Sequence, residues 1–137
     1  MASLDHLGLT VDDVPQSSVQ LNPVLEALGY VRAHNAADHA YWRKAGAPEV
    51  LLYPAREKGT GPHKHGRVGW QHIAFAVDSR EEVERLHDTA LAAGWTAVRE
   101  PKEYPRFTER YYASFVEDDN GIRFEFMHNP PRETQAG

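Results

Sequence analysis

The sequence predicts an α+β protein in which one unit, a strand followed by a helix and further strands, occurs twice. The first observation is an internal repeat, because residues 5–12 and 71–78 share a histidine, three spaced apolar residues and a closing aspartate at an offset of 66 positions. The second is a pair of matching helix ends, since residues 28–30 correspond to residues 93–95 at nearly the same offset. Self-similarity of this kind indicates two copies of one supersecondary unit.

The first strand of each unit alternates bulky and small side chains. In the second copy Ile73 and Phe75 alternate with Ala74, which is the period of two that a strand requires. We expect the bulky face to pack on a helix. The small face cannot fill a core, so we expect it to line an open cavity that also holds the histidine of the repeat.

One helix follows the first strand in each half. Ser79 opens a capping box, and Gly94 ends the helix that follows it. The helix of the first half is less regular, because Pro23 removes a backbone donor and its ring clashes with the preceding turn. We therefore expect a break near Asn22 and a helical segment over residues 23–28.

Further strands complete each half. They are expected at residues 41–44, 49–53, 97–99, 111–117 and 122–128. The last two join through Asp118-Asp119-Asn120-Gly121, a strong hairpin signal. The sequence thus predicts a single domain over residues 1–137, with modules at 4–55 and 70–129.

Composition excludes several functional classes. The 137 residues contain no cysteine, which rules out thiolate zinc sites, iron–sulfur clusters and cysteine nucleophiles. No run approaches the roughly 20 apolar residues that span a bilayer, and the N-terminus lacks a signal peptide, so a cytoplasmic location with no membrane contact is expected. The net charge is −5 and the basic residues are scattered, which argues against nucleic-acid binding. Eight histidines are unusual and point to metal or acid–base chemistry.

His6, His72 and Glu125 are the candidate site residues. The two histidines occupy the same place in the two copies, on the small-residue face. Glu125 alternates with two phenylalanines in the final strand, so it points to the opposite face from them. Two imidazoles and one carboxylate form a facial triad that binds a divalent first-row metal and leaves positions open for substrate. A single histidine on a strand is more often a hydrogen-bonded residue than a ligand, and Glu125 alone could pair with Arg123 or Arg110; the shared place of the two histidines in the repeat favours metal ligation.

The hairpin also predicts a neighbour for Glu125. If the four residues 118–121 form the loop, Ser114 lies opposite Glu125, and Tyr112 shares their face. Tyr112 is therefore a candidate catalytic residue beside the metal.

Arg106, Arg110 and Tyr111 lie near the same hairpin and could receive an anionic substrate. Pairing of the arginines with acidic neighbours is the simpler expectation.

The repeated module, its histidines and helix ends, and residues 118–125 together resemble the vicinal oxygen chelate superfamily, which includes glyoxalase I, extradiol dioxygenases and the fosfomycin and bleomycin resistance proteins. The resemblance covers residues 4–129. It implies two βαβββ modules whose eight strands form a U-shaped mixed sheet around a cavity, and a homodimer. It also implies one divalent metal ion, iron, manganese, nickel or zinc, with His6, His72 and Glu125 as its ligands.

One position departs from the glyoxalase-like members, which bring a fourth ligand, usually glutamate, from the last strand of the first module. Here Leu51 or Val50 occupies that place, and Glu49 is the nearest acid. Without a fourth ligand the set is similar to that of extradiol dioxygenases. A bulge or another register could still bring Glu49 to the metal.

The resemblance implies Lewis-acid chemistry on a small substrate that chelates the metal through two vicinal oxygens. One expected reaction is a dioxygenase reaction, with Fe(II) or Mn(II), assisted by Tyr112 or a loop histidine. The other is a glyoxalase-like lyase or isomerase reaction with Glu49 or Glu125 as the base. The alternative is a protein without turnover that sequesters a ligand, as bleomycin-binding relatives do.

Overall fold

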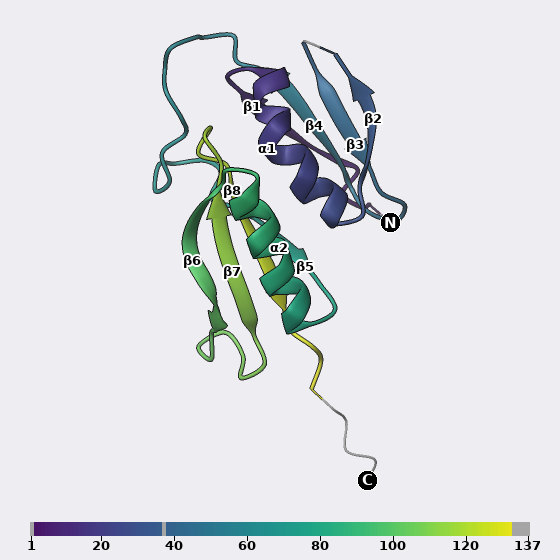
Figure 1. Ribbon diagram of the computed structural model, residues 1–137, viewed down its shortest axis with the longest axis vertical. Helices are drawn as coiled ribbons and strands as arrows, with labels where there is room; N and C mark the ends of the chain where they lie inside the picture. The colour runs from purple at the N-terminus through teal and green to yellow at the C-terminus, as the bar shows by residue number, and fades with distance from the viewer. Residues whose placement is uncertain (1, 37, 133–137) are drawn as a thin grey trace.

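The computed structural model describes residues 2–36 and 38–132, which form two βαβββ modules (Figure 1). The first module comprises β1 (His6–Val11), α1 (Val14–Ala27), β2 (Val31–Asn35), β3 (Ala40–Arg43) and β4 (Glu49–Pro54). The second comprises β5 (Ile73–Ala76), α2 (Arg80–Ala92), β6 (Thr96–Glu103), β7 (Tyr112–Glu117) and β8 (Arg123–His128). The predicted α+β fold of paired modules with eight strands is confirmed for the described residues.

The strands lie in two four-stranded mixed sheets, with the orders β1-β4-β3-β2 and β5-β8-β7-β6. In each sheet the first strand of the module pairs in parallel with the last, and the remaining pairs are antiparallel. β1 and β5 are therefore edge strands of different sheets. In Figure 1 each helix covers one sheet, and the two helices lie next to one another.

The two modules are joined through α1 and the start of β6. The indole of Trp95 donates to the backbone oxygen of Gln20 over 2.8 Å, and the Gln20 amide donates to the backbone oxygen of Gly94 over 2.9 Å. Trp95 is buried and its ring centroid lies 5.0 Å from that of Phe124 in β8. The hydrogen bonds between Gln20 and residues 94–95, together with the packing of α1 on α2, thus hold the two modules together.

The helix α1 runs through Pro23 without the predicted break, so that expectation is wrong. Its N-cap is Asp13, whose carboxylate accepts a hydrogen bond from the backbone of Gln16 over 2.8 Å. The carbonyl that Pro23 leaves without a helical partner belongs to Val19, whose side chain is exposed, so this turn is open to water. Val24 is fully buried, and its packing offsets the cost of the proline.

The alternation of bulky and small side chains in β1 and β5 leaves the bulky residues more buried than the small ones, as predicted. In β1, Leu9 is buried whereas Gly8 is exposed, and in β5 the side chain of Ala74 is exposed beside half-buried Phe75. The Phe75 ring packs 5.0 Å from that of Phe124, on the side of the sheet that contacts α2. The opposite face of this sheet remains available for a site.

The loop between β7 and β8 contains the five residues 118–122 rather than the expected four. The carboxylate of Asp118 accepts hydrogen bonds from the backbones of Asn120 and Ile122, both over 2.9 Å. Gly121 adopts φ +79°, and the backbone oxygen of His63 packs directly against it. The extra residue changes the register, so Glu117 pairs with Arg123.

The strand β6 is longer than the predicted 97–99 and contains two register shifts against β7, on either side of Arg99. Pro101 is tolerated because β6 is the outer strand of its sheet. The strand β2 was not predicted from the sequence. No helix in residues 2–36 and 38–132 is long and apolar enough to cross a membrane.

Candidate metal centre

The structure brings His72 and Glu125 together. The residue Ala74 of β5 lies directly opposite Glu125 of β8, so His72, two positions earlier, shares the face of Glu125. The Nε2 atom of His72 lies 3.0 Å from Oε1 of Glu125. The Glu125 side chain is 4% exposed and that of His72 is 28% exposed. A buried carboxylate and a partly accessible imidazole therefore face each other beside the sheet.

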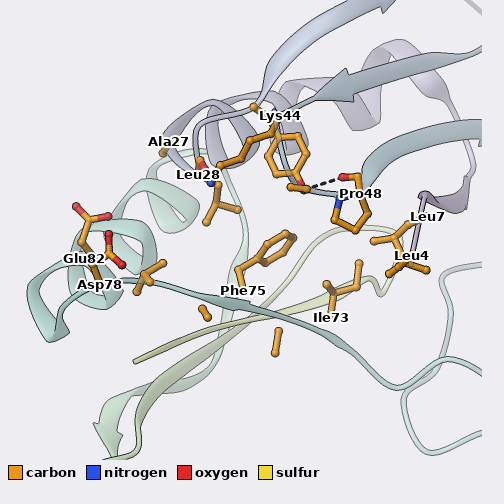
Figure 2. A pocket seen from close by; sticks show the side chains of 15 residues that line it. Leu4, Leu7, Ala27, Leu28, Lys44, Pro48, Ile73, Phe75, Asp78 and Glu82 are labelled. Atoms are coloured by element: carbon orange, nitrogen blue, oxygen red, sulfur yellow. Dashed lines mark hydrogen bonds between the residues drawn. The ribbon is translucent and has the colours of Figure 1, made fainter. Parts of the chain in front are cut away.

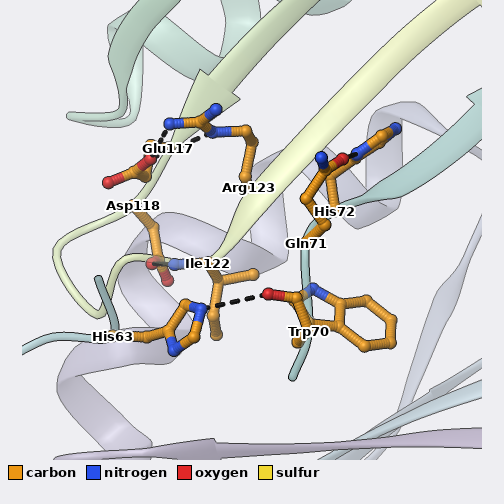
Figure 3. A network of polar contacts seen from close by, with 8 residues as sticks. All are labelled: His63, Trp70, Gln71, His72, Glu117, Asp118, Ile122 and Arg123. Atoms are coloured by element: carbon orange, nitrogen blue, oxygen red, sulfur yellow. Dashed lines mark hydrogen bonds and ion pairs between the residues drawn. The ribbon is translucent and has the colours of Figure 1, made fainter. Parts of the chain in front are cut away.

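The other nitrogen of His72 is oriented by its chain neighbour. Figure 3 shows the Nδ1 atom of His72 bonded to the side-chain oxygen of Gln71, over 2.5 Å. Because an amide oxygen only accepts, Nδ1 donates this bond, which leaves Nε2 directed toward Glu125. A histidine nitrogen and a carboxylate oxygen 3.0 Å apart can share either a proton or a metal ion, and N and O donors of this kind suit a divalent metal ion.

Tyr111 completes the surroundings of Glu125. Its hydroxyl donates a short hydrogen bond to Oε2, the carboxylate oxygen that does not face His72. Burial raises the pKa of Tyr111, and the hydrogen bond to Glu125 raises it further. Tyr111 thus keeps its proton at neutral pH and acts as a hydrogen-bond donor.

His6 does not join this pair within one chain. Its side chain is 56% exposed, and its Nδ1 atom lies 2.8 Å from the carboxylate of Asp5. Among the described residues no group of three or more histidine, aspartate or glutamate side chains could hold a metal ion. The chain's own fold therefore leaves the predicted set of His6, His72 and Glu125 divided between its two modules.

The repeat nevertheless extends to the partner of each histidine. Asp5 precedes His6 and contacts its Nδ1 atom, as Gln71 precedes His72 and contacts the equivalent atom. In both modules Nε2 is the atom left for a ligand. This arrangement is typical of metal-binding histidines, whose second ring nitrogen donates to an oxygen.

The first module has no counterpart of Glu125. Leu51 lies opposite Gly8 of β1 in the register that places Glu125 opposite Ala74 of β5. Glu49 lies opposite His6, and its Oε1 atom accepts a hydrogen bond from Arg43 over 3.0 Å. The position expected for a fourth ligand is therefore held by leucine, and the carboxylate of Glu49 is paired with arginine.

The predicted position of Tyr112 is wrong. Phe115, not Ser114, lies opposite Glu125, because the five-residue loop shifts the register by one and so exchanges the two faces of β7. The Tyr112 hydroxyl donates to Glu84 of α2 over 2.8 Å. Tyr111 contacts Glu125 instead. The sequence contains both tyrosines, but the loop length that selects between them is a property of the folded hairpin.

Two cavities bear on the predicted site residues. One, of about 440 Å³, is mainly apolar and lies between the modules, where Leu7 of β1 and Ile73 and Phe75 of β5 point into it (Figure 2). No histidine lines it. The other, of about 400 Å³, is lined by His72 and extends toward β6. The second cavity is the one that adjoins the candidate metal ligands.

Comparison with known proteins agrees with this architecture. Residues 3–126 match the model of the Glyoxalase/Bleomycin resistance protein/Dioxygenase superfamily. The chain is 26% identical over 125 residues to protein YqjT of Bacillus subtilis (strain 168), which covers 90% of this chain and 97% of that protein.

Solved structures of the same architecture are similar over nearly the whole chain. A glyoxalase/bleomycin resistance protein from Albidiferax ferrireducens has a TM-score of 0.75 at 20% identity, covering 93% of this chain and 100% of that one. The genomically encoded fosfomycin resistance protein FosX from Listeria monocytogenes has a TM-score of 0.70 at 17% identity, covering 95% of each chain. At these identities the likeness concerns the fold. With the family match over residues 3–126, it follows that the chain belongs to the Glyoxalase/Bleomycin resistance protein/Dioxygenase superfamily.

Proposed function

We propose that the protein is a divalent-metal-dependent enzyme whose metal centre is shared between two copies of the chain. His72 and Glu125 of one copy and His6 of the other would be the ligands, and the substrate would be a small molecule with two vicinal oxygens. The observation that carries the proposal is the 3.0 Å approach of His72 Nε2 to Glu125 Oε1. A metal bound there would act as a Lewis acid, lowering the basicity of oxygens bound to it.

The second copy is required by the position of His6. His6 has the same local arrangement as His72, but it is exposed and lies in the other sheet. A twofold-symmetric dimer presents the same two surfaces twice, so two equal sites would form if β1 of one copy approached β5 of the other. This explains why one chain holds two ligands together and leaves the third at its surface.

The remaining residues of the site hold the ligands and leave room for substrate. Tyr111 holds the Glu125 carboxylate in one orientation through its hydroxyl, and Gln71 does the same for the His72 ring. Leu51 supplies no donor atom, so a three-ligand metal would keep open positions for a chelating substrate. This donor set supports a dioxygenase-type reaction over a glyoxalase-like lyase or isomerase reaction that uses a fourth carboxylate.

The identity of the bound metal distinguishes between the reaction classes. Elemental analysis of protein purified without added metal is expected to find iron or manganese if the enzyme is a dioxygenase, and nickel or zinc if it is a lyase or isomerase. Protein that contains no metal and binds none on addition would contradict the proposal and favour a ligand-sequestering protein.

A mixed dimer tests whether the site is shared. His6→Ala and Glu125→Ala chains carrying different affinity tags would be produced together, and dimers holding both tags isolated. Each variant alone should lose metal at both sites. The mixed dimer combines the intact His6 of one chain with the intact His72 and Glu125 of the other, so it should regain about half of the wild-type metal content. A metal-free mixed dimer, or failure to recover any species with both tags, would contradict the shared site.

A further inference from the structure

The cavity beside His72 has an entirely basic charge pattern in an acidic protein. The net charge of the chain is −5. The cavity wall nevertheless contains the side chains of Arg99, Lys102, Arg106 and Arg123, and no aspartate or glutamate. A concave surface lined by charges of one sign concentrates ions of the opposite sign.

Three of these four charges have no acidic partner. Arg123 pairs with Glu117 through two nitrogens, at 3.1 and 2.8 Å (Figure 3). No ion pair within residues 2–36 and 38–132 includes Arg99, Lys102 or Arg106. The charges of these three side chains are therefore available to a ligand.

The register shifts of β6 place two of the cations on the face that carries Glu125. Arg99 lies opposite Phe115, which in turn lies opposite Glu125, so the three form one row across the sheet. Lys102 lies opposite Ala113, two positions before Phe115 on β7 and so on the same face. Arg99 and Lys102 are three residues apart and would face opposite sides of a regular strand, but the register shift between them brings both to one side.

The same cavity has an aromatic wall. Tyr104, Phe107 and Phe115 line it, and the Phe115 ring meets the His72 ring edge to face at a centroid distance of 5.5 Å. Lys102 lies 5.1 Å over the Tyr104 ring and Arg106 lies 4.7 Å over the Phe107 ring. The Tyr104 hydroxyl is buried and lies beside the Arg99 guanidinium. A cavity wall that places cations beside aromatic side chains suits a ligand that carries both an anionic group and an aromatic ring.

We infer that this cavity binds a small organic anion with an aromatic ring, whose charged group is held by Arg99, Lys102 and Arg106 and whose ring packs on Phe107 and Phe115. The inference rests on the proposed function, in which the cavity delivers the substrate's vicinal oxygens to the metal site at His72. It names the substrate class that this site selects.

Three probes that all carry two vicinal oxygens separate the effect of the charge from that of the ring. Mandelate carries an anionic group, an aromatic ring and two vicinal oxygens. Mandelamide keeps the ring and the oxygens without the charge, and lactate keeps the charge and the oxygens without the ring. Isothermal titration of the full chain should give at least about tenfold tighter binding of mandelate than of either analogue, because a hydrogen-bonded charge and a buried aromatic ring each contribute about that much. Equal binding of mandelate and either analogue, or no saturable binding of mandelate at millimolar concentration, would overturn the inference.

Substitutions assign the anion to the cavity. Arg99→Gln, Lys102→Gln and Arg106→Gln should each weaken mandelate binding about tenfold and leave mandelamide binding unchanged. The matched control is Arg110→Gln, since Arg110 is outside the cavity wall and is occupied by Glu109 and the backbone oxygen of Pro130. Mandelate binding that is unchanged in all three cavity variants, or weakened equally in the Arg110 variant, would also overturn the inference.

The failure of this inference can be told from the failure of the proposed function. The titrations would be repeated on chelator-treated, dialysed protein, and the metal content of every sample measured. Arg99, Lys102 and Arg106 would bind the anionic group without help from the metal. The preference for mandelate over mandelamide should therefore persist in metal-free protein. A protein that binds metal normally but shows no such preference refutes only the anion site, whereas a protein that never binds metal but keeps the preference refutes only the metal centre.

Discussion

At the scale of single residues, the site depends on a buried carboxylate whose two oxygens have different partners. One oxygen of Glu125 faces the imidazole of His72 and the other accepts the Tyr111 hydroxyl. Burial of such a group is costly unless both oxygens are satisfied. The carboxylate is therefore held in one orientation before any metal or substrate arrives.

Tyr111→Phe is expected to weaken metal binding about 10- to 100-fold, the usual effect of removing a hydrogen bond to a metal ligand. The variant keeps the ring and should keep the fold. Tyr112→Phe is the matched control, because that hydroxyl contacts the exposed side chain of Glu84 on α2, and it should leave metal affinity unchanged. A competition titration with a chromogenic chelator measures both. Equal affinities in the two variants would show that Tyr111 does not support the ligand.

Glu49→Gln should leave metal content and turnover nearly unchanged. The Glu49 carboxylate is paired with Arg43, and both side chains are more than a third exposed, so the pair contributes roughly 0–1 kcal/mol to stability. If Glu49 were instead the proton-transferring base of a lyase or isomerase, the rate would fall about 10²- to 10⁴-fold with the metal still bound. Steady-state kinetics with metal analysis of the same samples decide between the two, and Glu125→Gln serves as the positive control.

At the scale of elements, the β7–β8 hairpin sets the register on which the site depends. Its five-residue loop is closed by Asp118 and rests against the long connection between the modules, where the backbone of His63 donates to the carbonyl of Asn120 over 2.8 Å. A loop one residue shorter would exchange the faces of β7 and remove Phe115 and Tyr111 from Glu125.

Gly121→Ala should destabilise the fold more than a glycine substitution elsewhere. A Cβ atom at Gly121 would lie 2.0 Å from the backbone oxygen of His63, and φ is +79°. We expect a loss of about 2–4 kcal/mol, from the left-handed conformation and from separation of the two segments. Gly46→Ala is the matched control, since φ there is +75° with no atom within 4 Å of the added carbon, and it should lose only about 1–2 kcal/mol. Urea unfolding of both variants measures the difference, and equal losses would show that the His63 contact is unimportant.

At the scale of the whole molecule, the two modules pack helix to helix, and their first strands remain at the edges of separate sheets. One chain therefore presents two incomplete surfaces, one with His6 and one with His72 and Glu125. The acidic net charge and the basic cavity also belong to this scale, because a cavity lined by cations on an acidic protein favours anions locally.

Local sequence patterns were sufficient to predict much of the fold and part of the candidate site. The repeat, the period of two in β1 and β5, the capping box at Ser79 and the placing of both histidines on the small-residue face all follow from neighbours within a few residues along the chain. An apolar residue, Leu51 or Val50, in the fourth-ligand position was also expected from the family resemblance, and the pairing of β1 with β4 selects Leu51. Apart from that selection, these features need no knowledge of how distant segments meet.

Tertiary structure decided the rest. The continuity of α1 through Pro23 depends on the burial of Val24, and the choice of Tyr111 over Tyr112 depends on one extra residue in a loop that packs on His63. The cations of β6 face Glu125 only because of register shifts against β7. The separation of His6 from His72 follows from the packing of α1 on α2. In each case the deciding free energy comes from contacts between segments far apart in the sequence, which a pattern of neighbouring residues does not contain.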